Sequence, residues 1–504
     1  MPYHGVSDFL EELLTAGELL RVRAAVDADL EIAEITARCA AAGGPALLFE
    51  RVQGHDLAVV TNLLGTEARA CRVLGVPSLA ALAERMSQLA RPGGSQSWLE
   101  RLRGGEAMPL EKFRAKPARQ AACQQAVRLG RDIDLTALPA LRCWPGESGR
   151  VLTGRLIVAD GDSQQTSLRQ VRAVVVDRKH LAILDTEAID RGRGGAAQSG
   201  DSFPVAIALG GDPAATLAAA IDWTNLDGYV LAGLLRNQPW DVAQARSQPL
   251  AVPADADMVI EGVMRRGASE NIGGGNTIEA GAANAQPAIP HAKIAHATSG
   301  YYADPRVEPW LLEVSAITHR ASPVLPLIVA GDWSAGGPVG ETAVLHRVRD
   351  CLLQPLLSAA IPELVDCSLP LVGGRHGYAV LAIRKSYAGQ ARRAAHALWG
   401  MLPLEQTKCV VVVDADVNVH AAAEVLGRIA ANVSPERDVF FQTGPGSADD
   451  HAAPQPGLGH HLGIDATAKL QPEHPRPWPQ RLERPADLRE AVTRRWSEYG
   501  LPPL

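Results

Sequence analysis

The sequence predicts a mixed α/β (α+β) protein in three parts, and two observations predict it. Short apolar runs alternate with amphipathic segments near both ends of the chain, whereas the middle holds mostly short apolar runs separated by Gly, Pro and Asp. In addition, 504 residues are too many for one hydrophobic core. We therefore expect an N-terminal α/β domain (1–115), a central barrel or mixed sheet (116–322), and a C-terminal α/β domain with a tail helix (323–504).

The N-terminal part begins with a predicted helix. Phe9, Leu10, Leu13 and Leu14 fall on one helical face, and Gly17 follows as a stop signal. The run ELLRVRAAV then predicts a strand, LEIAEITARCAAAGG a helix closed by two glycines, and PALLFERV and LAVVTNLLG two further strands. The polar stretch MPLEKFRAKPARQAACQQ predicts a connector to the next part.

The central part is rich in predicted strands. The runs GRLIVAD, VRAVVVD, HLAIL, PVAIALG, DMVIEG and LLEVSAI favour a β-barrel or a mixed sheet. From about residue 325, strands again alternate with helices, as in PLIVAG, AVLHRVRDCLLQPLL, YAVLAIR and AGQARRAAHALWG. This alternation predicts a layered α/β unit, and the amphipathic segment DLREAVTRRWSEYG predicts the tail helix.

One long segment interrupts the central part. Residues 262–300 lie between two apolar runs, are rich in Gly, Ala and Asn, and show no sustained helical or strand period. A connection of this length inside a compact domain is usually functional or disordered. We therefore expect this segment to decide what chemistry the chain performs.

The composition argues against several classes of protein. A net charge of -7, a pI near 6.1 and the lack of a basic run do not predict nucleic-acid binding. No apolar run approaches the length of a membrane span, and the polar N-terminus does not resemble a signal peptide, so we expect a cytoplasmic protein. Seven widely separated cysteines without CxxC spacing predict reduced thiols.

Several segments together resemble the UbiD family of decarboxylases, which use prenylated FMN. The matching pieces occur in family order over about residues 7–470: DFLEELLTAGELLRV, GGPALLFERV, TNLLG, CWPGESG, PVAIALGGDP, VPADADMVIEG, ITHR, HALWG, TKCVVVVDADVNVH, SPERDV and PGLGHHLGIDAT. The resemblance implies a central split β-barrel that binds the flavin and a C-terminal domain used in dimerisation. It also implies a divalent metal such as Mn²⁺ or Mg²⁺, together with K⁺, and a flavin prenyltransferase that supplies the cofactor.

Compared with the family motifs, the segment SLRQVRAVVVDRKHL retains an arginine at Arg172 but has Ser167 where the family has a metal-binding asparagine. The family's metal-binding His falls nearest to Asp190, and its Glu falls on Gly228 or beside Asp227. Because hard cations accept Asp and Ser oxygens, Ser167, Asp190 and Asp227 are the candidate metal ligands. Three substitutions together also leave open that no metal binds.

The segment 262–300 departs from the family pattern too, because the two-acid motif E-G-P-F-G-[ED]-x-x-G-Y is absent. Aligned on the opening strand, Glu270 takes the place of the first acid. Decarboxylation needs an electron sink, which the flavin would supply, and then a proton. Glu270, His291 and His296 are the candidate proton donors, and Arg172 is the candidate to bind the substrate carboxylate in bidentate fashion. The alternatives are solvated loop residues and a structural ion pair of the arginine.

Three further residues are candidates for cofactor binding beside Ser167 and Arg172. The turn GGDP, with Gly210 and Asp212, either cradles a phosphate through its amides or forms an ordinary turn with Asp212 as a helix cap. Lys408, at the start of a predicted strand, either reaches a cofactor phosphate, as the resemblance implies, or extends from the strand edge into solvent.

Three functions remain open from the sequence. The first is a decarboxylase, or reversible carboxylase, of an aromatic, heteroaromatic or α,β-unsaturated carboxylic acid that uses prenylated FMN. The second is a family member without prenylated FMN, either a cofactor-independent enzyme or a non-catalytic subunit that pairs with an active paralogue. The third is other chemistry on a carboxylate-bearing metabolite. In each case we expect a homodimer or a higher homo-oligomer.

Overall fold

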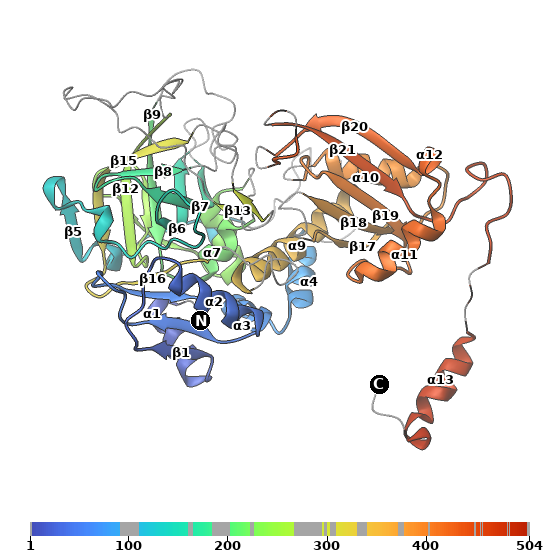
Figure 1. Cartoon of the computed structure of the whole chain (residues 1–504), viewed down its shortest axis with the longest axis horizontal. Coiled ribbons are helices and arrows are strands. Elements are labelled where there is room, and N and C mark those ends of the chain that lie inside the picture. Colours follow the sequence, from blue (N-terminus) through green and yellow to red (C-terminus); the bar gives the residue numbers. More distant parts are fainter. Residues whose placement is uncertain are drawn as a thin grey trace.

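The fold is described from a computed structural model. It describes residues 3–90, 110–159, 165–183, 202–221, 226–266, 295–296, 300–302, 309–329, 340–370, 377–401, 404–447, 450–453, 455, 457–480, 482 and 484–500. Figure 1 shows a barrel above an N-terminal α/β domain on one side and a C-terminal α/β domain on the other, with helix α9 between them. This arrangement confirms the predicted mixed α/β class.

The N-terminal domain is a four-stranded sheet with helices packed against it. Its elements are α1 (Val6–Thr15), β1 (Leu19–Val22), α2 (Glu31–Ala41), β2 (Ala46–Phe49), β3 (Ala58–Thr61), α3 (Glu67–Leu74) and α4 (Leu79–Ala90), with β16 (Val324–Pro326) as the fourth strand. In α1, Phe9, Leu10 and Leu13 are buried as predicted, but Leu14 is 49% exposed. Strand β16 pairs in parallel with β3, so residues beyond the barrel complete the N-terminal sheet.

Within the described residues, six strands close the central barrel, which confirms the barrel alternative. They are β6 (Val151–Ala159), β7 (Thr166–Val175), β8 (His180–Ile183), β9 (Ser202–Leu209), β12 (Met258–Arg266) and β15 (Trp310–His319), in the order β12-β9-β6-β7-β8-β15. Antiparallel pairing of β12 with β15 closes the ring. These two strands flank the long segment, which therefore connects neighbouring strands at one end of the barrel.

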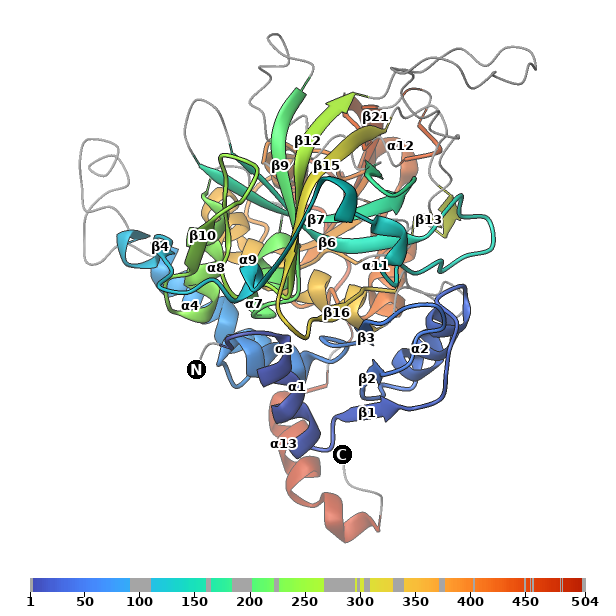
Figure 2. The ribbon, with the colours of Figure 1, turned by 90° about the vertical axis from the view of Figure 1, so that its left-hand side faces the viewer.

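Smaller elements surround the barrel. The helices α7 (Ala214–Ala219) and α8 (Gly228–Arg236) pack on the outer face of β6 and β7. Strand β5 (Ala126–Leu129) extends the sheet from β15, and β4 (Lys116–Pro117), β10 (Asp241–Gln244) and β11 (Ala251–Pro253) form a separate small sheet. Strands β13 (Ala295–His296) and β14 (Tyr301–Tyr302) pair in antiparallel fashion as a short hairpin. Figure 2 shows β13 beside the barrel.

The C-terminal domain is a five-stranded sheet covered by helices on both faces. Its elements are α9 (Gly340–Ala360), β17 (Leu364–Ser368), β18 (Tyr378–Ile383), α10 (Gln390–Trp399), β19 (Cys409–Asp414), α11 (Ala422–Asn432), α12 (Pro435–Asp438), β20 (Val439–Pro445) and β21 (Leu458–Asp465), with the strand order β17-β18-β19-β21-β20. The sheet packs on α10 and α9 through one core cluster and on α11 through another. The tail helix α13 (Ala486–Arg494) lies apart from the rest of the chain (Figure 1).

Two predictions from composition can be compared with this structure. All seven cysteines are free thiols. Among the residues described above, no helix combines the length and the apolar character that a membrane span requires.

Candidate active site

Two of the predicted site residues, Ser167 and Arg172, lie toward opposite ends of strand β7. Side chains alternate between the two faces of a strand, so Leu168, Gln170 and Arg172 share one face. Leu168 packs with residues of α7 and α8, which cover the outside of the barrel. Arg172 is the register partner of Thr153 on β6. The retained arginine therefore lies on the outer wall of the barrel, next to Thr153.

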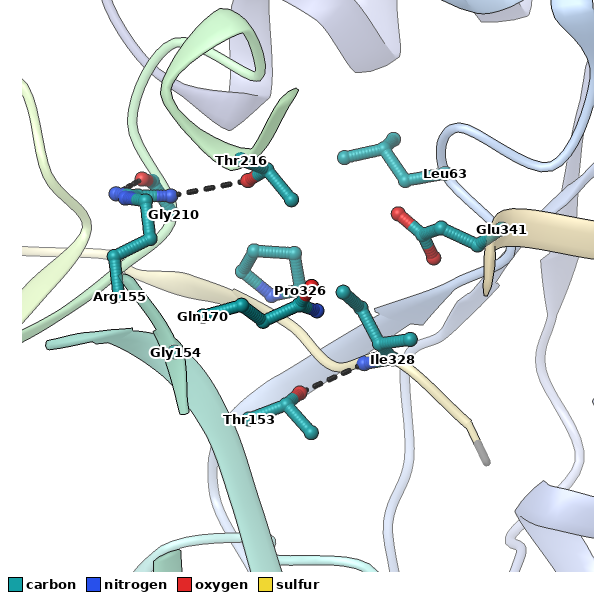
Figure 3. Close-up of a pocket in the computed structure, with 10 residues that line it drawn as sticks. All are labelled: Leu63, Thr153, Gly154, Arg155, Gln170, Gly210, Thr216, Pro326, Ile328 and Glu341. Atoms are coloured by element: carbon teal, nitrogen blue, oxygen red, sulfur yellow. Dashed lines mark hydrogen bonds between the residues drawn. The ribbon is translucent and has the colours of Figure 1, made fainter. Parts of the chain in front are cut away.

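A small cavity adjoins this position (Figure 3). Its volume is about 20 Å³, enough for about one water molecule. The lining combines residues of the barrel, of the N-terminal domain, of the segment at β16 and of the first turn of α9: Leu63, Thr153, Gly154, Arg155, Gln170, Gly210, Thr216, Pro326, Ile328 and Glu341. All three parts of the chain therefore contribute to one cavity.

Hydrogen bonds of β6 hold one wall of this cavity. Thr153 Oγ1 accepts a hydrogen bond from the Ile328 amide at 2.8 Å. Arg155 Nη1 donates to Thr216 Oγ1 at 3.2 Å, and Arg155 Nη2 donates to the Gly210 carbonyl. Burial lowers the pKa of Arg155. Its guanidinium thus joins the barrel to the turn before α7.

The opposite wall carries a buried carboxyl group that the sequence analysis did not single out. Glu341, in the first turn of α9, is 7% exposed, and its Oε1 accepts a hydrogen bond from the Leu64 amide at 3.3 Å. Burial raises the pKa of Glu341 to about 7, although the amides of Leu63 and Leu64 and the charge of Arg69 act in the opposite direction. A carboxyl group with such a pKa exchanges protons near neutral pH.

The β13–β14 hairpin contacts the guanidinium of Arg172. The Arg172 guanidinium donates to the Ala295 carbonyl, and the Ala295 amide donates to Glu147 Oε1 at 3.2 Å. Glu147 is buried, and its Oε2 also accepts the amides of Cys143 at 2.8 Å and Trp144 at 3.1 Å. Glu147 belongs to the motif CWPGESG. A continuous set of hydrogen bonds therefore runs from this motif through β13 to the arginine.

Two of the three candidate metal ligands lie at the other end of β7: Ser167 belongs to this strand, and Asp227 precedes α8 and contacts the Thr166 amide. Ser167 Oγ accepts a hydrogen bond from Arg169 Nε at 2.9 Å. Asp227 caps α8: its Oδ1 accepts two amides of the first turn at 2.9 and 3.1 Å, and its Oδ2 accepts the Thr166 amide at 2.7 Å. Asp190 lies outside the described residues.

These contacts do not suit a divalent metal. A guanidinium, itself a cation, contacts the serine oxygen, and both carboxylate oxygens of Asp227 already accept backbone amides. Within the described ranges, no group of three or more His, Cys, Asp or Glu side chains is placed to hold a metal ion. We therefore derive no chemical step through a metal.

The turn that contains Gly210 and Asp212 is also occupied by the protein's own groups. The Gly211 amide donates to Asp257 Oδ2 and the Asp212 amide to Asp255 Oδ2, each at 2.9 Å. Asp212 Oδ1 accepts an amide of the first turn of α7 at 2.9 Å, and burial raises the pKa of Asp212 to about 6. In this arrangement the two amides donate to carboxylates of the protein, and Asp212 contacts the first turn of α7, whose N-cap residue is Pro213.

Lys408, just before β19, is paired with an acid. Its Nζ lies 2.8 Å from Asp450 Oδ2. The next residue, His451, places its ring 4.3 Å from the ring of Tyr301, measured between centroids. The part of the C-terminal domain that carries Lys408 therefore contacts the same hairpin that holds Arg172.

The three candidate proton donors are not placed at the site by the structure. Glu270 and His291 lie outside the described residues. For His296 only the backbone is described, in β13 directly after Ala295. Of the catalytic candidates, Arg172 is thus the one whose side chain the structure describes.

The structure thus joins a closed barrel to an α/β domain on either side, and Arg172 lies on the outer wall of that barrel. Three family models match in order: the N-terminal domain at residues 10–89, the Rift-related domain at 114–333 and the C-terminal domain at 344–466 of 3-octaprenyl-4-hydroxybenzoate carboxy-lyase. The chain therefore belongs to the UbiD family, whose members are carboxy-lyases.

Two relatives match over almost the whole chain, and both are uncharacterised proteins. One, sll0936 from Synechocystis sp., is 33% identical over 98% of this chain and 95% of its own length. The other, from Archaeoglobus fulgidus, is 32% identical over 99% of both chains.

Solved structures agree with the fold. The UbiD-class enzyme HmfF from Pelotomaculum thermopropionicum, in complex with FMN, is 26% identical with a TM-score of 0.71, over 96% of this chain and 98% of its own. The vanillic acid decarboxylase of Sedimentibacter hydroxybenzoicus is 23% identical and shows the fold alone. Its closed form covers 100% of both chains with a TM-score of 0.80. Its open form has a TM-score of 0.71 over 99% of this chain and 100% of its own.

Proposed function

We propose that this chain is a decarboxylase, or reversible carboxylase, that acts on an aromatic, heteroaromatic or α,β-unsaturated carboxylic acid with prenylated FMN. The observation that carries this proposal is the position of Arg172. It lies on the outer barrel wall opposite Thr153, which lines the cavity, and its guanidinium is held through Ala295 and Glu147. A planar guanidinium with several donors is suited to a carboxylate.

The lining of the cavity supports a flavin in chemical terms. Apolar side chains of Leu63, Pro326 and Ile328 face polar groups of Thr153 and Gln170, and such a mixture is typical of cofactor sites. With room for about one water molecule, the cavity must widen before a flavin enters. Prenylated FMN, when bound, would supply the electron sink for the electron pair that CO₂ leaves behind.

The protein's own residues would then bind, orient and protonate. Arg172 would bind the substrate carboxylate, and the contact with Ala295 would keep the guanidinium from rotating away. The net reaction converts R–COO⁻ and one proton into R–H and CO₂. It therefore requires one acid in the site and no further oxidant or reductant.

The test is co-expression with a flavin prenyltransferase, which would supply the cofactor. We expect a purified protein with a flavin absorption spectrum that releases CO₂ from at least one member of a panel of aromatic and α,β-unsaturated acids. A protein that binds no flavin and releases no CO₂ from any of them would contradict the proposal.

A second function is favoured by the occupied metal donors at Ser167 and Asp227. In that case the chain acts without prenylated FMN, as a cofactor-independent enzyme or as a non-catalytic subunit of an active paralogue. Normal folding without flavin, and CO₂ release that appears only when a paralogue is added, would support the subunit alternative.

We also propose that the chain self-associates through the C-terminal domain. Phe441 on the edge strand β20 is 75% exposed, Leu426 on α11 is 62% exposed and Leu458 on β21 is 45% exposed. Exposed apolar groups of this kind gather at interfaces between subunits. Light scattering after size-exclusion chromatography should give at least twice the mass of the chain, and Phe441→Glu should lower that mass.

A further inference from the structure

We propose that Glu341 is the acid of this site: it carries the proton that reaches the substrate carbon when CO₂ leaves. This inference rests on the proposed decarboxylation and names the group that completes it. It is independent of Glu270, His291 and His296, the proton donors that the sequence suggested.

The geometry places the Glu341 carboxyl group at the cavity. Of the ten described lining residues, Glu341 alone carries a carboxyl group. Figure 3 draws it extending from the start of α9 toward the space between Leu63, Ile328 and Gln170. Gln170 shares its strand face with Arg172, two residues away. The acid therefore faces the cavity from α9, and the strand that carries Arg172 contributes Gln170 to the opposite side of that cavity.

The backbone before Glu341 is shaped for this position. Gly340 has a φ of +63°, a conformation that favours glycine. A Cβ atom on Gly340 would lie 2.7 Å from Ala40 Cβ and 2.9 Å from Asn62 Oδ1. Because glycine allows this close approach, α9 begins directly against the N-terminal domain, and its first side chain enters the cavity.

The surroundings of Glu341 suit a group that exchanges a proton. Its removal from water favours the neutral acid, with a pKa of about 7. The charged group that acts on it is Arg69 of α3, which is 1% exposed, and Arg155 of β6 lines another part of the same cavity. Arg69 favours the carboxylate form. Near neutral pH both forms are therefore populated, as a donor that is reloaded in each turnover requires.

The proposed step is balanced in atoms and charge. The C–C bond to the carboxylate breaks, CO₂ departs, and the electron pair returns to the substrate carbon as that carbon takes the proton of Glu341. The carboxylate that remains on Glu341 recovers a proton from water, for which the cavity has room beside it.

A structural role predicts different behaviour. In that case Glu341 only accepts the Leu64 amide and so ties α9 to the N-terminal domain. A glutamine oxygen accepts the same hydrogen bond, so Glu341→Gln would then change neither the catalytic rate nor its dependence on pH. Glu341→Gln therefore distinguishes a proton donor from a residue that only links α9 to the N-terminal domain.

Asp350 provides the matched control. It lies on the same helix α9, is partly buried beside Arg349, and has a pKa raised to about 6 by burial. It does not belong to the cavity lining described above. Asp350→Asn thus removes a buried acid from the same helix and leaves the cavity intact.

The first measurement needs no cofactor. Infrared difference spectra of the protein without flavin would record the C=O band of protonated carboxyl groups between about pH 5 and pH 9. We expect the wild type and Asp350→Asn to share a band that disappears with a midpoint near pH 7, and Glu341→Gln to lack it. If Glu341→Gln keeps the band, the assignment is overturned.

The second measurement uses the flavin-loaded protein. Removal of the acid should lower kcat by about 100-fold or more with little change in KM, whereas Asp350→Asn should stay within about twofold of the wild type. Glu341→Asp should restore part of the rate. Wild-type CO₂ release that Glu341→Gln leaves unchanged would overturn the role of Glu341 alone, whereas no CO₂ release by the wild type would overturn the proposed function.

If Glu341→Gln does not fold, the dependence of the wild-type rate of CO₂ release on pH tests the proposal instead. The rate should fall above about pH 7 as the acid form is lost, and a rate that stays constant to about pH 9 would contradict the proposal.

Discussion

The two ends of strand β7 belong to one continuous element but differ in what their side chains contact. At one end, Arg172 lies opposite Thr153, which lines the cavity, and contacts a backbone carbonyl of a separate hairpin. At the other end, Ser167 contacts Arg169, and Asp227 accepts three backbone amides. At the first end the arginine contacts a segment distant in the sequence, whereas at the second end the serine and the carboxylate contact residues close to β7 and α8.

We interpret this difference as a UbiD scaffold that keeps the arginine proposed to bind the carboxylate, while the residues proposed as metal ligands contact the protein's own groups. An oxygen that accepts a buried amide stabilises a helix start or a strand end, and replacing that contact by a metal would leave the amide without an acceptor. The predictions below test this contrast.

Arg172→Ala should have the largest effect. It removes the side chain that we propose binds the substrate carboxylate, so kcat/KM for CO₂ release should fall by about 100- to 1,000-fold. Arg172→Lys should recover little, because lysine lacks the planar bidentate geometry. Activity within tenfold of the wild type in the alanine variant would remove Arg172 from the site.

Glu147→Ala should come next. The change leaves the amides of Cys143, Trp144 and Ala295 without their acceptor, which should lower the free energy of unfolding by about 1–3 kcal/mol. Because Ala295 then holds Arg172 less firmly, kcat/KM should fall by about tenfold. Glu147→Gln serves as the control that keeps an acceptor. A stable alanine variant with full activity would show that the hairpin does not position Arg172.

The pH dependence of stability should reveal the acid at the cavity. The folded-state pKa of Glu341 is raised from its ordinary value of 4.5 to about 7, so between these values the folded protein binds more protons than the unfolded chain. Its contribution to the free energy of unfolding therefore decreases as pH rises through this window, by at most about 1.4 kcal/mol per pH unit. Denaturant titrations from pH 5 to pH 7 should give a smaller decrease in Glu341→Gln. Equal slopes in both proteins would count against a raised pKa.

Asp227→Ala should have the smallest effect on activity. Loss of the α8 cap should lower the free energy of unfolding by about 1–2 kcal/mol, and Asp227→Asn should recover most of it. Once folded, the alanine variant should release CO₂ within about twofold of the wild type, because the residue serves the helix. A large loss of activity at unchanged stability would instead indicate a ligand role.

The fold could be predicted from the sequence because its signals are local. The apolar runs of β12 and β15 identify both strands, and Gly17 adopts a φ of +71° after α1, as a helix stop does. The closure of the barrel by β12 and β15 is a contact between distant segments, and no local pattern specifies it. The prediction of a split β-barrel came instead from the resemblance to the UbiD family.

The site could be predicted in part. Arg172 was identified from a motif, but Glu341 was not, because a single acid at a helix start is typical of the first turn of any helix. Its burial arises from Leu63 and Leu64, far away in the sequence. The contacts of Asp227 are likewise formed only in the folded chain. Its position in the sequence therefore predicts a metal ligand and does not reveal that both carboxylate oxygens accept backbone amides.

The central claim is that catalysis belongs to the Arg172 end of β7 and not to the Ser167–Asp227 end. The most direct test compares CO₂ release by flavin-loaded Arg172→Ala and Asp227→Ala, each treated with a metal chelator. We expect the arginine variant to be inactive, whereas the chelator-treated aspartate variant should keep a rate close to that of the wild type. An inactive Asp227→Ala protein, or a wild type that stops when the chelator is added, would contradict it.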